Sequence, residues 1–392
     1  MPSYFKIPKA IVYGRGSIEE LKKLRSKHVA VFTDRASMEK FGFLQRTKDL
    51  LREAGAEEVQ VSPDISREPA FGDVSKCIEW ARTFSPDHVV ALGGGSVIDV
   101  AKTVRVLLNR PGFDMVNLTR IFEFPRTADN VKGLTVIPST SGTGSEITRL
   151  VVLVNPRTGL KELLISEELT ADTAIIDPDL PSMMPPGVTA NTGFDALSHA
   201  LESYVCTNSN DFSEPLALKS IQLIFNNLER CYKNGRDMEA REKMHYASTI
   251  AGMAMANSGA GLVHRMDQVG PQFNLPHGLV MAILLPYVMR YNSKECAAKY
   301  AEVAKVLGIR EPTNELMSEG LARKTEELRS RLNMPPTLEK AGIGEADLVK
   351  NVEAASIDAI AGQATKFHPR KATLEEVKRL FWCSFRGEEV AF

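Results

Sequence analysis

Short apolar runs alternate with helix-like segments along the first 180 residues of the chain. Residues 28–32 (HVAVF) and 88–92 (HVVAL) have the length and composition of buried strands, and residues 74–84 between them carry apolar side chains at helical spacing. Further strands are predicted at 11–13, 59–61 and 134–137, and a helix near 48–54. Because strands that alternate with helices pair in parallel, this pattern predicts an α/β domain that binds ligands at the carboxyl ends of its strands.

The pattern changes near residue 180, where prolines interrupt the chain within residues 177–187 (DPDLPSMMPPG) and helical periodicity follows. Residues 245–261 are rich in Ala, Ser and Gly, which is typical of a helix packed tightly among others. The apolar segment 278–289 is too short to span a bilayer and is interpreted as a buried helix. We therefore predict an α/β domain with a parallel sheet at residues 1–180 and an all-α domain at residues 181–392.

Composition narrows the class of protein. Of the 392 residues 43% are hydrophobic and 25% are charged, as in an ordinary globular protein, and the net charge of −1 gives no basic surface for nucleic acid or an anionic membrane. The five cysteines are scattered without a Cys-x-x-Cys pair, and the first residues show no apolar run typical of a secretory signal. These features predict a cytoplasmic protein that acts on small molecules.

The glycines at 93–95 lie between a predicted strand and a predicted helix. Without Cβ atoms, their backbone N–H groups can approach a phosphate closely, and the helix N-terminus adds partial positive charge. The spacing matches neither the G-x-G-x-x-G nor the G-x-x-x-x-G-K-[ST] pattern. The stretch predicts a phosphate or dinucleotide site, and the alternative is a tight turn without a ligand.

Asp195 and His199 are four residues apart, which places both side chains on one face of a helix. A carboxylate and an imidazole so placed can share a divalent metal, although an ordinary surface pair has the same spacing. Two further histidines, His264 and His277, stand at loop-to-helix positions of the same half. A histidine beside an apolar helix is usually a core residue, but together the four side chains favour a site with three histidines and one aspartate.

Five segments in order resemble one known family, the iron-dependent (group III) alcohol dehydrogenases. They are GGGSVIDVAK (93–102), PSTSGTGSE (138–146), IIDPDL (175–180), TGFDALSHALESYV (192–205) and NLPHGLVMAILLPYVM (274–289). The similarity runs from Tyr13 to about Met289. It implies a dinucleotide-binding α/β domain followed by a helical metal-binding domain, and a homodimer.

The resemblance also implies roles for individual residues. Asp195, His199, His264 and His277 match the family's ligands to one divalent metal, Fe²⁺ or Zn²⁺. The residues that match positions contacting the cofactor are Gly94, Gly95, Ser96, Asp99, Ser139, Thr140, Thr143 and Lys161, with Lys102 in the same helix as Asp99. Asp34 matches the acidic residue that favours NAD over NADP, because a carboxylate accepts a hydrogen bond from a ribose 2′-OH and repels a 2′-phosphate. The alternative for Asp34 is a plain turn residue.

The chain departs from the family at Gln268. Members usually show His-x-x-x-His, with the second histidine near the substrate, whereas this chain reads His264-Arg-Met-Asp-Gln268. The interval from His264 to His277 is also one residue shorter than usual. Because glutamine cannot act as a general acid, the proton would come through water or a ribose hydroxyl, or Gln268 would bind substrate. Asp267 is a second candidate, with a solvent-facing side chain as the alternative.

The implied activity is reversible hydride transfer between NAD(H) and a small aldehyde or its primary alcohol. Arg149, Arg265 and residues 366–370 (KFHPR) offer positive charge, and they suggest an anionic aldehyde such as sulfoacetaldehyde or phosphonoacetaldehyde. Three alternatives stay open. They are a general short-chain alcohol dehydrogenase, a lyase resembling 3-dehydroquinate synthase on the same scaffold, and a non-catalytic NAD-binding protein.

Overall fold

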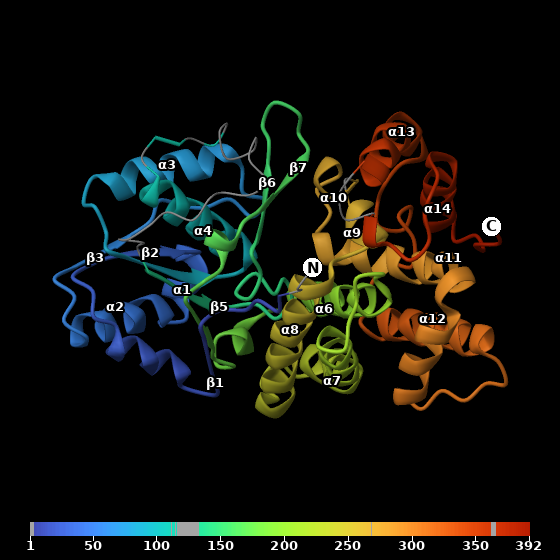
Figure 1. The fold of residues 1–392 in the computed structure, drawn as a ribbon, viewed down its shortest axis with the longest axis horizontal. Coiled ribbons are helices and arrows are strands. Elements are labelled where there is room, and N and C mark those ends of the chain that lie inside the picture. Colours follow the sequence, from blue (N-terminus) through green and yellow to red (C-terminus); the bar gives the residue numbers. More distant parts are fainter. Residues whose placement is uncertain (1–3, 111, 114, 116–132, 268, 362–365) are drawn as a thin grey trace. The chain divides into compact units, whose positions relative to one another are not determined.

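The computed structural model describes residues 4–110, 112–113, 115, 133–267, 269–361 and 366–392. Within it the chain forms two compact units, Lys6–Met184 and Pro185–Phe392 (Figure 1). Tyr4 and Phe5 belong to the second unit, where the ring of Phe5 lies 6.1 Å from that of Phe212.

A six-stranded parallel sheet forms the centre of the first unit, in the order β1-β8-β5-β4-β2-β3. Every described pairing in this sheet is parallel, and β4 lies between β2 and β5. The strands are β1 (Ala10–Tyr13), β2 (His28–Thr33), β3 (Glu58–Val61), β4 (His88–Gly93), β5 (Gly133–Pro138) and β8 (Thr173–Ile176). This arrangement confirms the predicted α/β fold.

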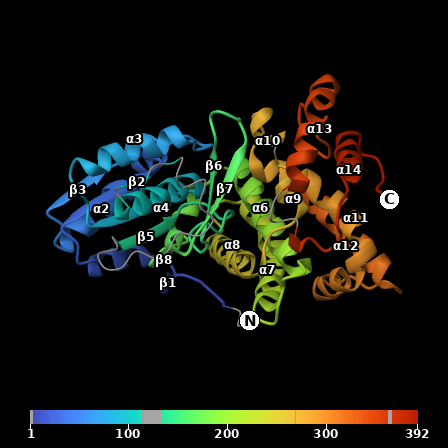
Figure 2. The same cartoon turned by 45° about the horizontal axis from the view of Figure 1, so that its top comes forward.

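Helices cover both faces of this sheet (Figures 1 and 2). Val29 and Val31 of β2 pack into a core with side chains of η1 (Ser17–Lys23), α1 (Arg35–Lys40) and α2 (Phe43–Glu53). On the other face, Phe32 meets Trp80 of α3 (Phe71–Arg82) edge to face, with ring centroids 5.6 Å apart. The remaining elements are α4 (Gly95–Asn109), the antiparallel hairpin of β6 (Leu150–Val154) and β7 (Lys161–Ile165), η2 (Glu167–Leu169) and η3 (Pro181–Met183). Because both faces are covered, β4 is buried along its whole length and reads as a continuous apolar run.

The second unit is built from helices throughout its described residues. They are α6 (Pro186–Val205), α7 (Ser213–Lys233), α8 (Met238–Ser258), α9 (Leu262–Arg265), α10 (Val269–Gln272), α11 (His277–Val306), α12 (Asn314–Arg331), α13 (Glu345–Ala361) and α14 (Leu374–Arg386). Helix α6 is buried along most of its length, from Gly193 to its end. The predicted all-α character of this half is confirmed.

The long helix α11 contains the apolar segment 278–289 that the sequence analysis interpreted as a buried helix. All of its residues except Leu279 are buried in the core of the unit, including Pro286. The backbone departs from helical geometry at Cys296, where two helices meet at a kink. Among the helices that the structure describes, none is both long enough and apolar enough to cross a membrane.

Candidate active site

The glycine turn occupies the carboxyl end of β4, where Gly94 caps the N-terminus of α4. A Cβ atom on Gly95 would lie 2.7 Å from Cγ2 of Thr143, and one on Gly94 would lie 3.4 Å from Cγ2 of Thr140. The loop after β5 is also tied to the turn, because the Ser139 N–H donates to the Gly93 carbonyl at 2.9 Å. The structure therefore brings Gly94, Gly95, Ser139, Thr140 and Thr143 together. The N-terminus of a fifteen-residue helix at this place favours an anion such as a pyrophosphate.

Asp99 and Lys102 lie further along α4 and make their contacts inside the protein. The buried carboxylate of Asp99 accepts hydrogen bonds from the Ser145 hydroxyl and, at 2.9 Å, from the Val152 N–H. Lys102 is fully buried and donates to the Thr148 carbonyl at 2.7 Å, and burial lowers the pKa of its amine to about 8. Both side chains hold the β6 region on α4, and the role of Asp99 toward a cofactor stays a prediction.

Three other residues expected to contact the cofactor lie at the ends of helices or strands: Ser96, Asp34 and Lys161. The Ser96 hydroxyl donates to the Arg67 carbonyl at 2.5 Å. Asp34 is exposed after β2 and caps α1, where its carboxylate accepts from the Ser37 hydroxyl at 2.6 Å. Lys161 begins β7 with its Nζ 3.6 Å from a Glu68 carboxylate oxygen. Their roles toward a cofactor stay predictions.

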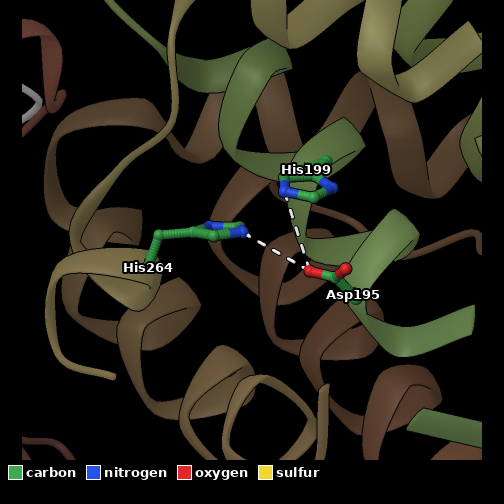
Figure 3. Close-up of side chains that lie close together, drawn as sticks. All are labelled: Asp195, His199 and His264. Atoms are coloured by element: carbon green, nitrogen blue, oxygen red, sulfur yellow. Dashed lines mark ion pairs between the residues drawn. The ribbon is translucent and has the colours of Figure 1, made fainter. Parts of the chain in front are cut away.

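The four predicted metal ligands meet in the helical unit. Asp195 and His199 lie one turn apart on α6, His264 lies in α9, and His277 is the first residue of α11. The Nε2 atoms of the three histidines point to one oxygen, Oδ1 of Asp195, at 3.6 Å for His199, 3.7 Å for His264 and 3.2 Å for His277. Figure 3 shows the His199 and His264 rings converging on the carboxylate of Asp195.

The helices approach closely enough for this convergence because residue 278 is glycine. A Cβ atom at Gly278 would lie 1.9 Å from the Asn191 carbonyl oxygen, which belongs to α6. The start of α11 therefore touches the backbone of α6 one turn before Asp195. Any larger residue would push His277 away from the carboxylate.

Unpaired polar atoms at this cluster indicate that a cation fits there. Asp195 Oδ1 and His264 Nε2, which face each other at the centre, are buried and make no hydrogen bond within the described part of the chain, an arrangement that is costly unless something else binds them. One ligand atom from each of Asp195, His199 and His264 lies within 4.8 Å of the others. Ligands held by one ion at about 2.1 Å are about 3–4 Å apart, so a small contraction would complete the site. Three imidazoles and one carboxylate suit Fe²⁺ or Zn²⁺.

Two more carboxylates hold the outer nitrogens of two of these histidines. Glu202 Oε2 lies 2.5 Å from Nδ1 of His264, and Asp267 Oδ2 lies 2.5 Å from Nδ1 of His277. Burial alone would lower the pKa of both imidazoles, but the neighbouring carboxylates outweigh it and raise the pKa of His264 to about 9 and that of His277 to about 10. Burial dominates at His199 and lowers its pKa to about 4. The cluster therefore favours positive charge, which a bound metal would supply in place of protons.

The sequence indicates no role for Glu202 and two alternatives for Asp267, a proton donor or a solvent-facing side chain. Asp267 is only 2% exposed, so the solvent-facing alternative is wrong. Glu202 could have been found from spacing, because Asp195, His199 and Glu202 follow one another at intervals of four and three residues on the same helix face. Gln268, the proposed substrate-proximal residue, lies outside the described residues.

Two of the cationic residues suggested for an anionic substrate, Arg265 and Arg370, form ion pairs within the helical unit. Arg265 donates to the carboxylate of Asp358 at 3.0 Å, and Arg370 donates to Glu376 at 2.9 Å while its guanidinium lies 3.8 Å from the ring centre of Tyr291. His368 is buried, which lowers its pKa to about 4 and keeps it neutral. Its Nδ1 accepts a hydrogen bond from the Leu262 N–H at 3.2 Å, so it supports α9.

Comparisons with known proteins match nearly the whole chain to one family. The family model described as iron-containing alcohol dehydrogenase matches residues 8–178, and the model described as the C-terminal part of the Fe-containing alcohol dehydrogenase family matches residues 189–385. The chain is 38% identical over 389 residues to the NADPH-dependent butanol dehydrogenase of Clostridium saccharobutylicum, covering 99% of both chains.

Solved structures give the same result. An iron-containing alcohol dehydrogenase from Thermococcus thioreducens has a TM-score of 0.89 at 33% identity, with 98% of this chain and 100% of that chain covered. Sulfoacetaldehyde reductase from Bifidobacterium kashiwanohense in complex with NAD⁺ has a TM-score of 0.87 at 25% identity, with 99% and 100% covered.

Proposed function

Because the chain belongs to the iron-containing alcohol dehydrogenase family, whose members are oxidoreductases that interconvert alcohols and aldehydes, we propose that it acts on a small uncharged aldehyde and its primary alcohol. We further propose that one divalent metal is held by Asp195, His199, His264 and His277. The observation that carries this proposal is the convergence of three buried or half-buried imidazoles on Asp195 Oδ1.

When bound, the metal supplies a Lewis acid for the substrate oxygen, and the nicotinamide ring supplies or accepts the hydride. The residues of this chain do the rest. Asp195 contributes the one charged ligand, and Glu202 and Asp267 accept hydrogen bonds from Nδ1 of His264 and His277, which leaves Nε2 of each ring facing the centre. These residues would hold a metal with its positive charge at the centre, and that charge would stabilise negative charge developing on the substrate oxygen.

The cofactor would be held at the glycine turn through backbone N–H groups at the start of α4. Gly94 and Gly95 leave the approach to these groups open, and the loop of Ser139, Thr140 and Thr143 borders it. We propose NAD(H) as the preferred cofactor, because Asp34 presents an exposed carboxylate at the carboxyl end of β2. The relative from Clostridium saccharobutylicum is named as NADPH-dependent, so the measurement must include both cofactors.

The preference for an uncharged substrate is supported by the ion pairs of Arg265 and Arg370, whose charges are already balanced by Asp358 and Glu376. The proton would reach the substrate oxygen through water or a ribose hydroxyl, as the sequence suggests from glutamine at position 268. A homodimer is expected from the resemblance.

The test is the initial rate of NADH and NADPH oxidation by Fe²⁺- or Zn²⁺-loaded protein with propanal, butanal and sulfoacetaldehyde. We expect turnover of the two uncharged aldehydes, a higher kcat/KM with NADH, and at least a 100-fold loss in His277→Ala. His28→Gln in β2 is the matched control and keeps full activity. A preference for sulfoacetaldehyde would instead support the hypothesis of an anionic aldehyde as the substrate. If no aldehyde changes the nicotinamide absorbance, the lyase or non-catalytic alternatives would replace this proposal.

A further inference from the structure

We infer that Asp267 is a positioning residue that sets how tightly the helical unit holds its metal, an inference that rests on the proposed metal site. Asp267 lies in the turn after α9 and contacts two of the four proposed ligands. Its N–H donates to the His264 carbonyl at 3.4 Å, and its carboxylate lies 2.5 Å from Nδ1 of His277. Asp267 therefore links the backbone of His264 to the ring of His277.

His277 needs such a partner more than the other histidines do. Its side chain is 31% exposed, compared with 15% for His264 and 7% for His199. The ring of His199 is fixed by packing and stacks on the ring of His264 with centroids 4.4 Å apart. His277 stands at the end of a helix, where packing encloses it less, so a hydrogen bond from the ring to a buried acceptor must supply the orientation.

The hydrogen bond also selects the form of the ring. A neutral imidazole carries one proton on either nitrogen, and a carboxylate at Nδ1 keeps the proton there. Nε2, which lies 3.2 Å from Asp195 Oδ1, then keeps its lone pair for the metal. The negative charge of Asp267 further strengthens His277 as a donor, and outer partners of this kind typically contribute 10- to 100-fold in metal affinity.

Glu202 makes the corresponding contact with His264, but it has a second task. Its other oxygen, Oε1, accepts a hydrogen bond from the Val263 N–H at 2.7 Å, so removing Glu202 would also loosen the backbone of α9. Asp267 is therefore the cleaner position at which to test the effect of an outer carboxylate on the metal.

The experiment measures the Zn²⁺ and Co²⁺ dissociation constants of the full chain by competition with a chelator, together with the visible absorption spectrum of the Co²⁺ form. Asp267→Asn keeps an oxygen that can accept from Nδ1 but loses the charge, and Asp267→Ala loses both. We expect about tenfold weaker binding for Asp267→Asn and up to about 100-fold for Asp267→Ala, with a shifted Co²⁺ spectrum in the alanine variant. His277→Ala sets the scale for loss of a ligand.

Glu319→Gln is the matched control, because it removes a carboxylate that pairs with Arg290 of the same helix α11, while Glu326 remains as a partner. It should bind metal as the wild type does. If the wild type binds no metal, the proposed function fails. If the wild type binds metal and His277→Ala does not, but both Asp267 variants match the wild type in affinity and spectrum, only the inference about Asp267 is overturned. A lower melting temperature of metal-free Asp267→Ala with unchanged affinity in Asp267→Asn would also overturn it.

Discussion

The glycine turn in the α/β unit and the histidine cluster in the helical unit differ in which part of the chain would meet the proposed ligand. At the turn, contact would be made by the backbone, and the missing side chains let the loop of Thr140 and Thr143 come close. At the cluster, contact would be made by side chains from three helices, and the close backbone approach at Gly278 brings these helices together. We therefore expect the glycine turn to tolerate substitutions that add no atoms, and the histidine cluster to tolerate substitutions that keep the donor atoms.

The largest expected effect comes from Asp195, because all three histidines point to its Oδ1. Asp195→Asn removes the only charged ligand, and we expect turnover to fall by at least about 100-fold and the metal content to fall with it. Cofactor binding, measured by NADH fluorescence, should stay within about twofold of the wild type. Equal losses of metal and NADH binding would contradict the separate construction of the two sites.

For Gly95→Ala we expect the opposite of the result for Asp195→Asn, because cofactor binding should weaken while the metal stays bound. The new methyl group would lie 2.7 Å from Thr143 Cγ2, and overpacking of this kind costs about 1–3 kcal/mol. If the turn moves to relieve the contact, NADH affinity falls by about 10- to 100-fold, while bound metal, measured by atomic emission, is unchanged.

Two further variants sharpen this prediction. Thr143→Ala should partly restore NADH binding to Gly95→Ala, because it removes the two atoms nearest the new methyl group. Gly72→Ala on α3, where a Cβ atom would meet nothing within 4 Å, should bind NADH normally. Full affinity in Gly95→Ala alone would show that the turn adapts without cost.

A smaller effect is expected in how the stability of the α/β unit depends on pH. Burial lowers the pKa of His88 in β4 from its ordinary value of 6.5 to about 4. Between these values the unfolded chain binds the extra proton, so the α/β unit loses stability as the pH falls from 6.5 to 4, by at most about 3 kcal/mol. His88→Gln should flatten this part of the curve in urea unfolding followed from pH 7 to 4.

The smallest expected effect concerns the choice of cofactor. Asp34→Asn removes the charge that would repel a 2′-phosphate but keeps a polar side chain able to cap α1. We expect the ratio of kcat/KM for NADH to that for NADPH to fall several-fold, mainly through KM for NADPH. An unchanged ratio would make Asp34 a capping residue only.

Local sequence patterns predicted much of this structure. The run His88–Leu92 followed by three glycines predicts a buried strand and a turn, because the next few residues determine both. The spacing of Asp195 and His199 likewise places two ligands on one face of α6. For Asp99 the only role predicted from the sequence was the one implied by the family resemblance. The hydrogen-bond partners of its side chain, Ser145 and Val152, come from chain segments about 50 residues away, which no local pattern reveals.

Asp267 shows a second limit. Counting forward from His264 leads to Gln268, whereas counting back from His277 by the family's usual spacing leads to Asp267, because the interval between the two histidines is one residue short. A single sequence does not show whether the missing residue lies before or after the position of the family's second histidine. The geometry of the turn after α9 decides which side chain reaches His277, and that geometry depends on how α9 and α11 pack.

The placement of the four ligands has a consequence for unfolding. Asp195 and His277 are 82 residues apart along the chain, with α7, α8, α9 and α10 lying between α6 and α11. A metal bound to both ends would act as a reversible cross-link around that loop and add the free energy of binding to that of folding. Loss of the metal would then lower the free energy of unfolding of the helical unit, so the metal supply in a cell would set the protein's lifetime against proteases as well as its activity.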